Sequence, residues 1–403
     1  MLQFLADHVD GLLGLGFWGK AAMAFVAVHI SMAAVTLYLH RDQAHRAIDL
    51  HPAIRHFFRL WIWLTSGMVT REWVAVHRKH HAFCETRDDP HSPVVHGLRT
   101  ILLRGAEVYR LETANQETLE KYGRGCPDDW LERHVYRHGL IGVWLMLAID
   151  VLLFGAGGIT LFAVQMVAMP FFAAGVINGV GHAIGYRNFE TEDASTNLVP
   201  VGVLIGGEEL HNNHHAFPTS ARFSLRPGEF DIGWFYIRAL AALGLCRIGR
   251  LAPVPHFAAA PRPVDVDTLR AVLQNRMHVL RDYSRRVVMP VLRMERRSRR
   301  GDVLLRSAGR LLTRWPGLMD EPARQRLARI LATSPVLHTV DQYRQQLMHV
   351  WQQANVSNER LVAELREWCA RAEASGIAAL EDFSARLREY IPQPQAQLRP
   401  VPA

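Results

Sequence analysis

Apolar residues along the chain gather into blocks that alternate with very polar ones. From Trp18 to Tyr38 the stretch "WGKAAMAFVAVHISMAAVTLY" is long enough to cross a hydrocarbon core of roughly 30 Å at about 1.5 Å per helical residue. A second apolar region, residues 140–182, is interrupted by "GAGG" at residues 155–158 and predicts two further spans joined by a tight turn. The pattern therefore predicts an all-α integral membrane bundle with three crossings.

A shorter apolar segment, "HFFRLWIWLTSGMVT" at residues 56–70, is ambiguous. Its purely apolar part is short and includes Arg59, so we expect an interfacial or re-entrant helix rather than a fourth crossing. The first 16 residues and the turn at 155–158 contain no Lys or Arg, whereas arginines are frequent after Leu39. The positive-inside rule then puts residues 41–139 and everything after residue 182 on the cytoplasmic side.

Composition changes toward the C-terminus. We expect an N-terminal segment at 1–16, a membrane domain at 17–252, a linker "PVPHFAAAPRPV" at 253–264, a basic helical extension at 265–391 and a tail at 392–403. The net charge is +8, and "LRMERRSRR" at 292–300 is its most basic stretch. This stretch fits anionic lipid headgroups or an acidic redox partner; nucleic acid is the weaker alternative, because no nucleic-acid motif accompanies it.

Histidines occur at spacings that suit metal binding. "HRKHH" at 77–81 and "HNNHH" at 211–215 each place three imidazoles at i, i+3 and i+4, on one face of a helix. In "HRDQAH" at 40–45 the separation is five, about 140° on a straight α-helix, so we expect the helix to bend or end soon after His40. "NGVGH" adds Asn178 and His182 on one face.

Together these motifs contain nine histidines, which exceed the need of one ion and suit two. The nine are His40, His45, His77, His80, His81, His182, His211, His214 and His215. A structural zinc site closes with about four ligands, so a redox pair of irons fits the count better. The alternative is that these are solvated loop histidines in a chain that contains 21. The four cysteines are scattered without a CxxC pair and indicate neither a disulfide framework nor an iron–sulfur site.

With their flanks, "REWVAVHRKHHAFCETRDDPHSP" and "GGEELHNNHHAFP", the three histidine motifs resemble the histidine boxes of membrane fatty acyl desaturases, in particular the bacterial branch of the stearoyl-CoA type. The resemblance covers roughly residues 15–250. It implies a helical bundle with a cytoplasmic helical cap that holds two irons, in the bacterial inner membrane. It also implies an O2-dependent Δ9 desaturase of long-chain fatty acyl-CoA, in which Asn178 holds a metal-bound water.

Two features depart from that family. It usually has four spans, yet only about 17 residues precede Trp18 here, and the pair before the second box, usually Arg-Asp in animal enzymes, is Ala75-Val76. The chain has no heme, flavin or ferredoxin signature, so electrons would come from a separate donor, ferredoxin-type or an oxidoreductase.

The resemblance also suggests where the substrate lies. The blind end of an acyl tunnel would be near Ala24 and Val28, and Trp73 would line the entrance, although packing explains Trp73 equally well. Polar residues beside the boxes are expected to orient ligand histidines, as carboxylates commonly do. These are Asp88, Asp89, His91, Glu208 and Glu209; His91 is equally consistent with a plain loop residue.

Rival functions remain at this stage. A histidine-box hydroxylase or an acyl-lipid desaturase would use the same scaffold, and product analysis separates an alcohol from an alkene. A non-catalytic membrane metal-binding protein would keep the histidines but need no acyl tunnel or electron donor. A membrane-tethered nucleic-acid binder would show steep salt dependence in binding.

Overall fold

The computed structural model of the protein describes residues 10–353 and 356–393. The described residues form two compact units. The first takes its residues from Met1–Arg187 and Ala194–Ala252, and the second from Asn188–Asp193 and Pro253–Arg399. The expected N-terminal segment and tail lie largely outside the described residues.

The first unit is helical, as the apolar pattern predicts. Its α-helices are α2 (Phe17–Ala34), α3 (Pro52–Ser66), α4 (Thr70–Phe83), α5 (Pro93–His96), α6 (Leu98–Thr113), α7 (Gln116–Tyr122), α8 (Gly139–Phe154), α9 (Gly157–Met169), α10 (His211–Ala216) and α11 (Ile232–Ala242). Wider π-helical segments are η1 (Val35–Ala44), η2 (Glu132–Tyr136) and η3 (Pro170–Ile177). Short 3-10 turns are η4 (Val180–His182) and η5 (Glu208–Leu210).

Two helices in the described residues are long and apolar enough to cross a membrane. They are Phe17–Ala44, formed by α2 and η1, and Gly157–His182, formed by α9, η3 and η4. The third expected crossing, α8, is apolar but has only 16 residues, fewer than the ~20 that a full span needs. The turn between α8 and α9 falls at Gly155 and Ala156, inside the predicted "GAGG".

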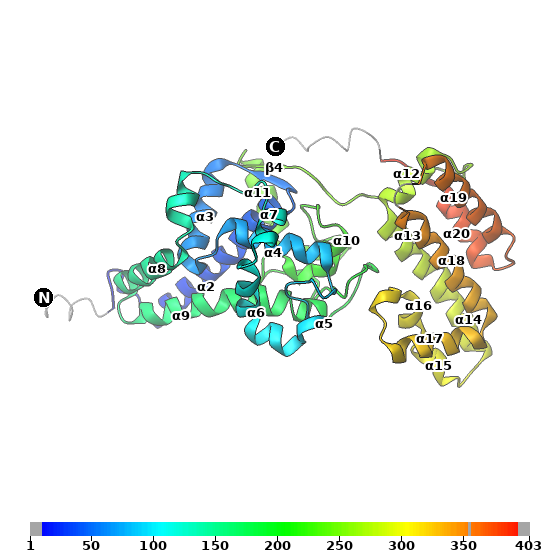
Figure 1. The fold of residues 1–403 in the computed structure, drawn as a ribbon, viewed down its shortest axis with the longest axis horizontal. Helices are drawn as coiled ribbons and strands as arrows, with labels where there is room; N and C mark the ends of the chain where they lie inside the picture. The colour runs from blue at the N-terminus through cyan, green and yellow to red at the C-terminus, as the bar shows by residue number, and fades with distance from the viewer. Residues whose placement is uncertain (1–9, 354–355, 394–403) are drawn as a thin grey trace, which may run out of the picture. The chain divides into compact units, whose positions relative to one another are not determined.

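Helix α3 occupies the ambiguous segment and is not among the helices long enough to cross. It ends at Gly67, which has a φ of 66°. Helix α3 packs beside α2 and α8 (Figure 1). A Cβ on Gly142 of α8 would lie only 2.4 Å from the Trp63 carbonyl oxygen, so a glycine is needed for this close approach. The buried Arg59 of α3 pairs with Asp129 and Glu132 rather than facing an apolar medium alone.

Short paired strands connect segments of the first unit that are far apart in the sequence. Strand β1 (Ile48–Leu50), just after the first histidine box, pairs antiparallel with β4 (Cys246–Ile248), with Ile48 opposite Ile248. Strand β2 (Val201–Gly202) pairs in parallel with β3 (Phe230–Asp231). The β2–β3 pair joins the segments before and after the third box.

The second unit is also helical and has its own hydrophobic core, which includes Tyr283, Trp368 and Phe383. Its helices are α12 (Val266–Gln274), α13 (Arg276–Tyr283), η6 (Ser284–Val288), α14 (Met289–Ser298), α15 (Val303–Arg306), α16 (Ala308–Thr313), η7 (Pro316–Leu318), α17 (Glu321–Thr333), α18 (Pro335–Gln352), α19 (Asn358–Glu373) and α20 (Ala378–Arg388). The segment expected as a linker contains strand β5 (His256–Phe257), which pairs antiparallel with β6 (Tyr390–Ile391).

Candidate metal centre

The first histidine box lies on a widened helix end. From Val35 the chain continues as a π-helix, in which backbone bonds run from residue i to i+5 instead of i+4. The amide of His45 accordingly donates to the carbonyl of His40 at 3.0 Å. We expected the helix to bend or end here; it widens instead, and the five-residue spacing becomes one turn. The two rings lie with centroids 5.0 Å apart.

The second and third boxes are helical, as their spacing predicts, but the three imidazoles of each box do not converge on one point: each box contributes to two different groups of histidines. Helix α4 carries His77, His80 and His81, and the six-residue helix α10 carries the third box. His182 lies in the 3-10 turn η4, at the end of the long apolar helix that begins at Gly157.

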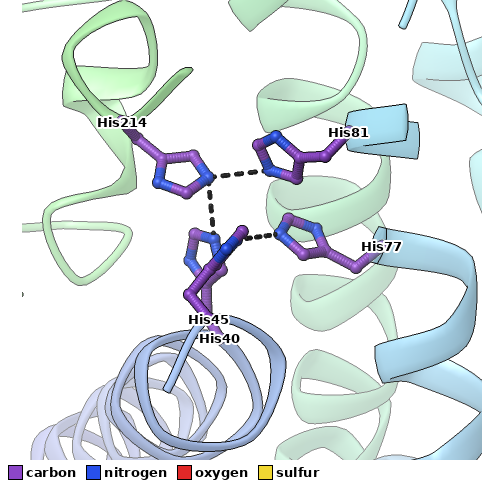
Figure 2. A group of neighbouring side chains, drawn as sticks. All are labelled: His40, His45, His77, His81 and His214. Carbon is purple, nitrogen blue, oxygen red and sulfur yellow. Dashed lines mark hydrogen bonds between the residues drawn. The ribbon is translucent and has the colours of Figure 1, made fainter. Parts of the chain in front are cut away.

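The nine histidines converge as two neighbouring groups. In each group the ligand-capable atoms lie within 4.8 Å of one another. The first group is His40, His45, His77, His81 and His214. Figure 2 shows these five rings pointing toward one another from η1 and its C-cap residue His45, from α4 and from α10. The second group is His80, His182, His211 and His215, all of them buried. Because His45 Nε2 and His77 Nε2 lie 2.8 Å apart, the first and second boxes are on the same side.

The spacing of the nitrogens fits a metal ion. Ligands at right angles around an ion, each at about 2.1 Å, lie about 3.0 Å apart. The distances between Nε2 atoms are 3.0 Å for His40 and His214, 2.9 Å for His81 and His214, and 2.9 Å for His182 and His211. Each neutral imidazole carries only one N–H. Hydrogen bonds between the rings therefore cannot satisfy all the nitrogen lone pairs that face one another. A shared cation in each group satisfies them together.

Carboxylates set which nitrogen of three histidines is available. His40 Nδ1 lies 2.8 Å from Glu208, and His80 Nδ1 lies 2.9 Å from Asp89. His182 Nδ1 lies 2.8 Å from Glu85. A carboxylate accepts the Nδ1 proton, so each Nε2 presents its lone pair to the group, which is the usual arrangement behind metal-binding histidines.

The protonation of these groups favours metal binding. Burial, with the neighbouring imidazoles, lowers the pKa well below its usual value in five of them, so they are neutral and able to bind a cation. The five are His45, His77, His81, His211 and His214. Burial alone would raise the pKa of the Glu208 carboxyl, but contacts with His40, Arg41 and Thr36 lower it overall. For Glu85 burial likewise raises the pKa, but the contacts with His182, Ser92 and the Ala194 amide together lower it overall.

Only some of the residues expected to orient ligand histidines contact a histidine in the structure. Asp89 and Glu208 contact ligand-group histidines, as just described. Asp88 is exposed, and in the described residues no hydrogen bond joins its side chain to a histidine. Glu209 instead accepts the backbone amides of Ile205 and Gly207 and so shapes the loop before α10. Of these two neighbouring glutamates, only Glu208 contacts a histidine of the metal groups.

His91 is buried against the second group. Its ring centroid lies 4.3 Å from that of His80, and its Nδ1 has no hydrogen-bond partner. His91, Asp89 and His80 also form a small cluster of their own that could hold an ion.

Glu85 was not among our sequence candidates. Its φ of 65° is unusual for a non-glycine residue, and this conformation follows directly from the end of the second box. The carboxylate contacts His182 through Oε1, and it accepts the Ser92 hydroxyl through Oε2 at 2.5 Å. An acidic residue four positions after the last histidine of a box was the only signal in the sequence.

An apolar cavity of about 690 Å³ reaches the metal groups. At one part of its wall lie His40, His77, His211, Asn178 and Glu208. Elsewhere it is lined mainly by apolar side chains of η1, α4, α8, α9 and η3, and by polar Glu72, Thr113, Arg110 and Arg137. Its volume is in the usual range for small-molecule sites.

Three expected substrate contacts can now be placed. Trp73 lines the cavity and stacks on His77 with centroids 4.8 Å apart. Ala24 and Val28 are half-buried on α2 but do not line the cavity; on this helix the lining begins at Met32, followed by Val35 on η1. Asn178 lines the cavity at the end of η3, beside the second group.

Residues 16–243 match the model of the family described as fatty acid desaturase. The chain belongs to the fatty acid desaturase family. That stretch holds all nine histidines and the cavity. Family membership and the two long apolar helices indicate association with a membrane.

Similar curated desaturases differ in the carrier of the acyl chain. The chain is 31% identical to Delta-9 acyl-lipid desaturase 1 of Arabidopsis thaliana, over 57% of its own length and 74% of that protein. It is 29% identical to the sn-1 stearoyl-lipid 9-desaturase of Synechocystis sp., over 59% and 73%. It is 32% identical to the icosanoyl-CoA 5-desaturase of Limnanthes douglasii, over 57% and 64%. These relatives act, by their names, on lipid-linked or on CoA-linked acyl chains, so they support a fatty acid desaturase without distinguishing the expected acyl-CoA type from an acyl-lipid type.

The second unit has a match of a different kind. Residues 269–394 match the model of a family described as transposase. The described part of this stretch consists of helices and the short strand β6. The match bears on the unassigned extension and not on the metal groups.

Proposed function

We propose that the protein is an O2-dependent di-iron desaturase that introduces a cis double bond, at the Δ9 position, into a long-chain saturated fatty acyl-CoA. The observation that carries this proposal is the pairing of two histidine groups with one apolar cavity. A methylene C–H is not acidic enough for acid–base residues to break. Two irons bound in the histidine groups would activate O2, which is the oxidant. The O2 would be reduced to two waters by two hydrogens from the acyl chain together with two electrons and two protons from outside.

The chain's own residues have definite roles in this proposal. The five histidines of the first group and the four of the second would hold the ions, and Asn178 would hold a metal-bound water beside the second group. Glu208, Asp89 and Glu85 keep the proton on Nδ1 of their histidines. The apolar cavity wall would bind the acyl chain beside the metal groups, with Trp73 stacked on His77 as part of that wall.

The polar part of the cavity wall supports an acidic carrier. Arg110 and Arg137 are exposed cations at the lining, and neither has an acidic partner within ion-pair distance in the described residues. They suit the phosphates of coenzyme A. A lipid-esterified chain is the second candidate, because two of the relatives above are named lipid desaturases and because apolar Val76 lines the cavity.

The proposal places the protein in the bacterial inner membrane with the metal groups facing the cytoplasm. The bacterial membrane rests on the resemblance described above. The arginine distribution and the position of the groups at the ends of both long apolar helices support the cytoplasmic side. Electrons would come from a separate ferredoxin-type protein or oxidoreductase.

The test is fatty-acid profiling in a bacterial host that expresses the protein, with double-bond position fixed by derivatisation. His80→Ala removes a buried member of the second group, and His96→Ala is the matched control, because His96 is exposed and outside both groups. A new monounsaturated acid that disappears only in His80→Ala supports desaturation. A hydroxy acid instead would favour the hydroxylase. With purified protein and a reduced donor, conversion of acyl-CoA but not of acyl lipid supports the carrier, and the reverse result rejects it.

A further inference from the structure

Charged residues are unevenly distributed along the second unit. Residues 276–314 contain twelve arginines and three acidic residues, a net charge of +9, which exceeds the +8 of the whole chain. Residues 335–393 contain six arginines and eight acidic residues. The positive charge is therefore concentrated on the helices from α13 to α16.

The three acidic residues of the basic region are already engaged. Asp282 pairs with Arg281, and Asp302 pairs with Arg299. Glu295 accepts the Ser334 hydroxyl at 2.7 Å. They are not available to neutralise the exposed arginines around them.

One surface of this region combines charge with exposed apolar side chains. On η6 and α14 the inner positions Val287, Val288, Val291 and Leu292 are buried in the core of the unit. The outer positions Arg286, Arg293 and Arg297 are exposed, and none has an ion-pair partner among the described residues. Met294, between them, is 67% exposed, and nearby in sequence Val303 of α15 is 69% exposed. We call Arg286, Arg293, Met294 and Arg297 the basic face.

We propose that the basic face docks onto the anionic headgroups of the bilayer in which the first unit sits, with Met294 entering the headgroup layer. Basic helices with apolar side chains among their cations bind at the membrane interface in this way. The long apolar helices of the same chain keep the face near a lipid surface, which raises its effective concentration there. Nucleic acid would use the arginines but give no reason for an exposed methionine among them.

The experiment uses the full chain in lipid nanodiscs. Ser298→Cys places a fluorophore on an exposed position next to Arg297 and leaves Met294 in place, and the labelled parent chain gives the background from the natural cysteines. Quenching by lipids spin-labelled at the headgroup is compared between zwitterionic phosphatidylcholine discs and discs that also contain phosphatidylglycerol. We expect quenching to be stronger in the anionic discs and to fall as salt is raised.

Charge variants then identify the face. The triple variant R286Q/R293Q/R297Q should weaken docking on the order of 100-fold, since each basic residue near an anionic surface contributes roughly a factor of five. The control R270Q/R324Q/R360Q removes the same charge from exposed arginines that pair with acidic residues of their own helices. It should leave quenching close to that of the parent. Met294→Ser alone should reduce quenching without altering its salt dependence.

Three results would overturn the proposal. The first is quenching that does not depend on phosphatidylglycerol, and the second is quenching that falls equally in the control variant. The third is binding of a labelled DNA duplex that needs the three arginines while lipid composition has no effect, which would assign the face to nucleic acid.

Discussion

The Nδ1 atom of His40 and the Oε1 atom of Glu208 lie 2.8 Å apart, although 168 positions separate the two residues in the chain. The same carboxylate oxygen accepts the hydroxyl of Thr36 at 2.6 Å. Glu208 thereby joins the end of the first long helix to the turn before the third box. The orientation of one metal-facing imidazole depends on this single side chain.

Replacing Glu208 by Gln should weaken the first metal group selectively. The amide no longer accepts the Nδ1 proton as strongly, and loss of such a partner typically costs 10- to 100-fold in metal affinity or activity. If the protein binds two irons as proposed, elemental analysis of the purified variant should find about one ion in place of two. Glu120→Gln, at an exposed position on α7, is the control. Full iron content in Glu208→Gln would contradict the role.

Glu85→Gln should have the corresponding effect on the second group. Glu85 contacts His182 and also accepts the amide of Ala194 and the hydroxyl of Ser92. We therefore expect loss of about one iron together with a lowered melting temperature, and a double variant with Glu208→Gln should lose both irons. If the double variant lost no more iron than either single one, the two groups would not be separate sites.

Removal of metal should destabilise the first unit. Nine imidazoles converge there with several lone pairs facing one another, and ligand binding at 100 times its Kd stabilises a fold by about 2.7 kcal/mol per site. Dialysis against a chelator should lower the melting temperature in detergent, and ferrous iron should restore it. In His80→Ala the restoration should be smaller. An unchanged melting temperature after complete iron removal would argue against a metal in these groups.

Chain-length preference should follow the cavity wall. Val35→Phe fills space along that wall, so we expect products to shift toward shorter acyl chains in fatty-acid profiling. Ala24→Tyr should leave the profile unchanged, because Ala24 does not line the cavity. The opposite pattern would show that the substrate runs along α2, as the resemblance first suggested.

Arg41 should be important for folding. It forms two bonds to Asp231, is buried, and its guanidinium lies 3.8 Å from the centroid of the Phe223 ring. Arg41→Gln leaves a buried carboxylate unpaired and should cost about 3–5 kcal/mol of unfolding free energy. Arg247→Gln removes an exposed arginine near Asp49 and should cost at most about 1 kcal/mol. Denaturation of both variants in detergent measures the difference, and equal costs would contradict the argument.

The sequence anticipated the parts of the site that depend on local spacing. His77, His80 and His81 share a face because helical geometry requires it, and the convergence of the boxes followed from the requirement for a common side. Asp88 and Asp89 could not be separated by sequence, because a turn decides which of two neighbouring carboxylates points inward. The role of Glu85 depends on a positive φ and on a partner 97 positions away, and neither leaves a pattern in the chain.

The substrate path was the least predictable part. Counting turns back from His40 assumes that the cavity follows α2, whereas its wall is assembled from several helices that meet only in three dimensions. Small residues on one helix do not reveal such a wall. The charge of the C-terminal extension was visible in sequence, but its exposed arrangement around Met294 required the fold of η6 and α14.

Because the helix end at Val35–Ala44 is widened, the geometry of the first box depends on the number of residues in this segment as well as on which residues they are. If a single residue were deleted between His40 and His45, their spacing would fall from five to four, and the backbone bond from the His45 amide to the His40 carbonyl would become an ordinary α-helical one. Such a deletion would thus change how the two rings face each other while leaving every histidine present. Chimaeras between desaturases should therefore exchange α2, η1 and His45 as one piece, with the junction placed after His45.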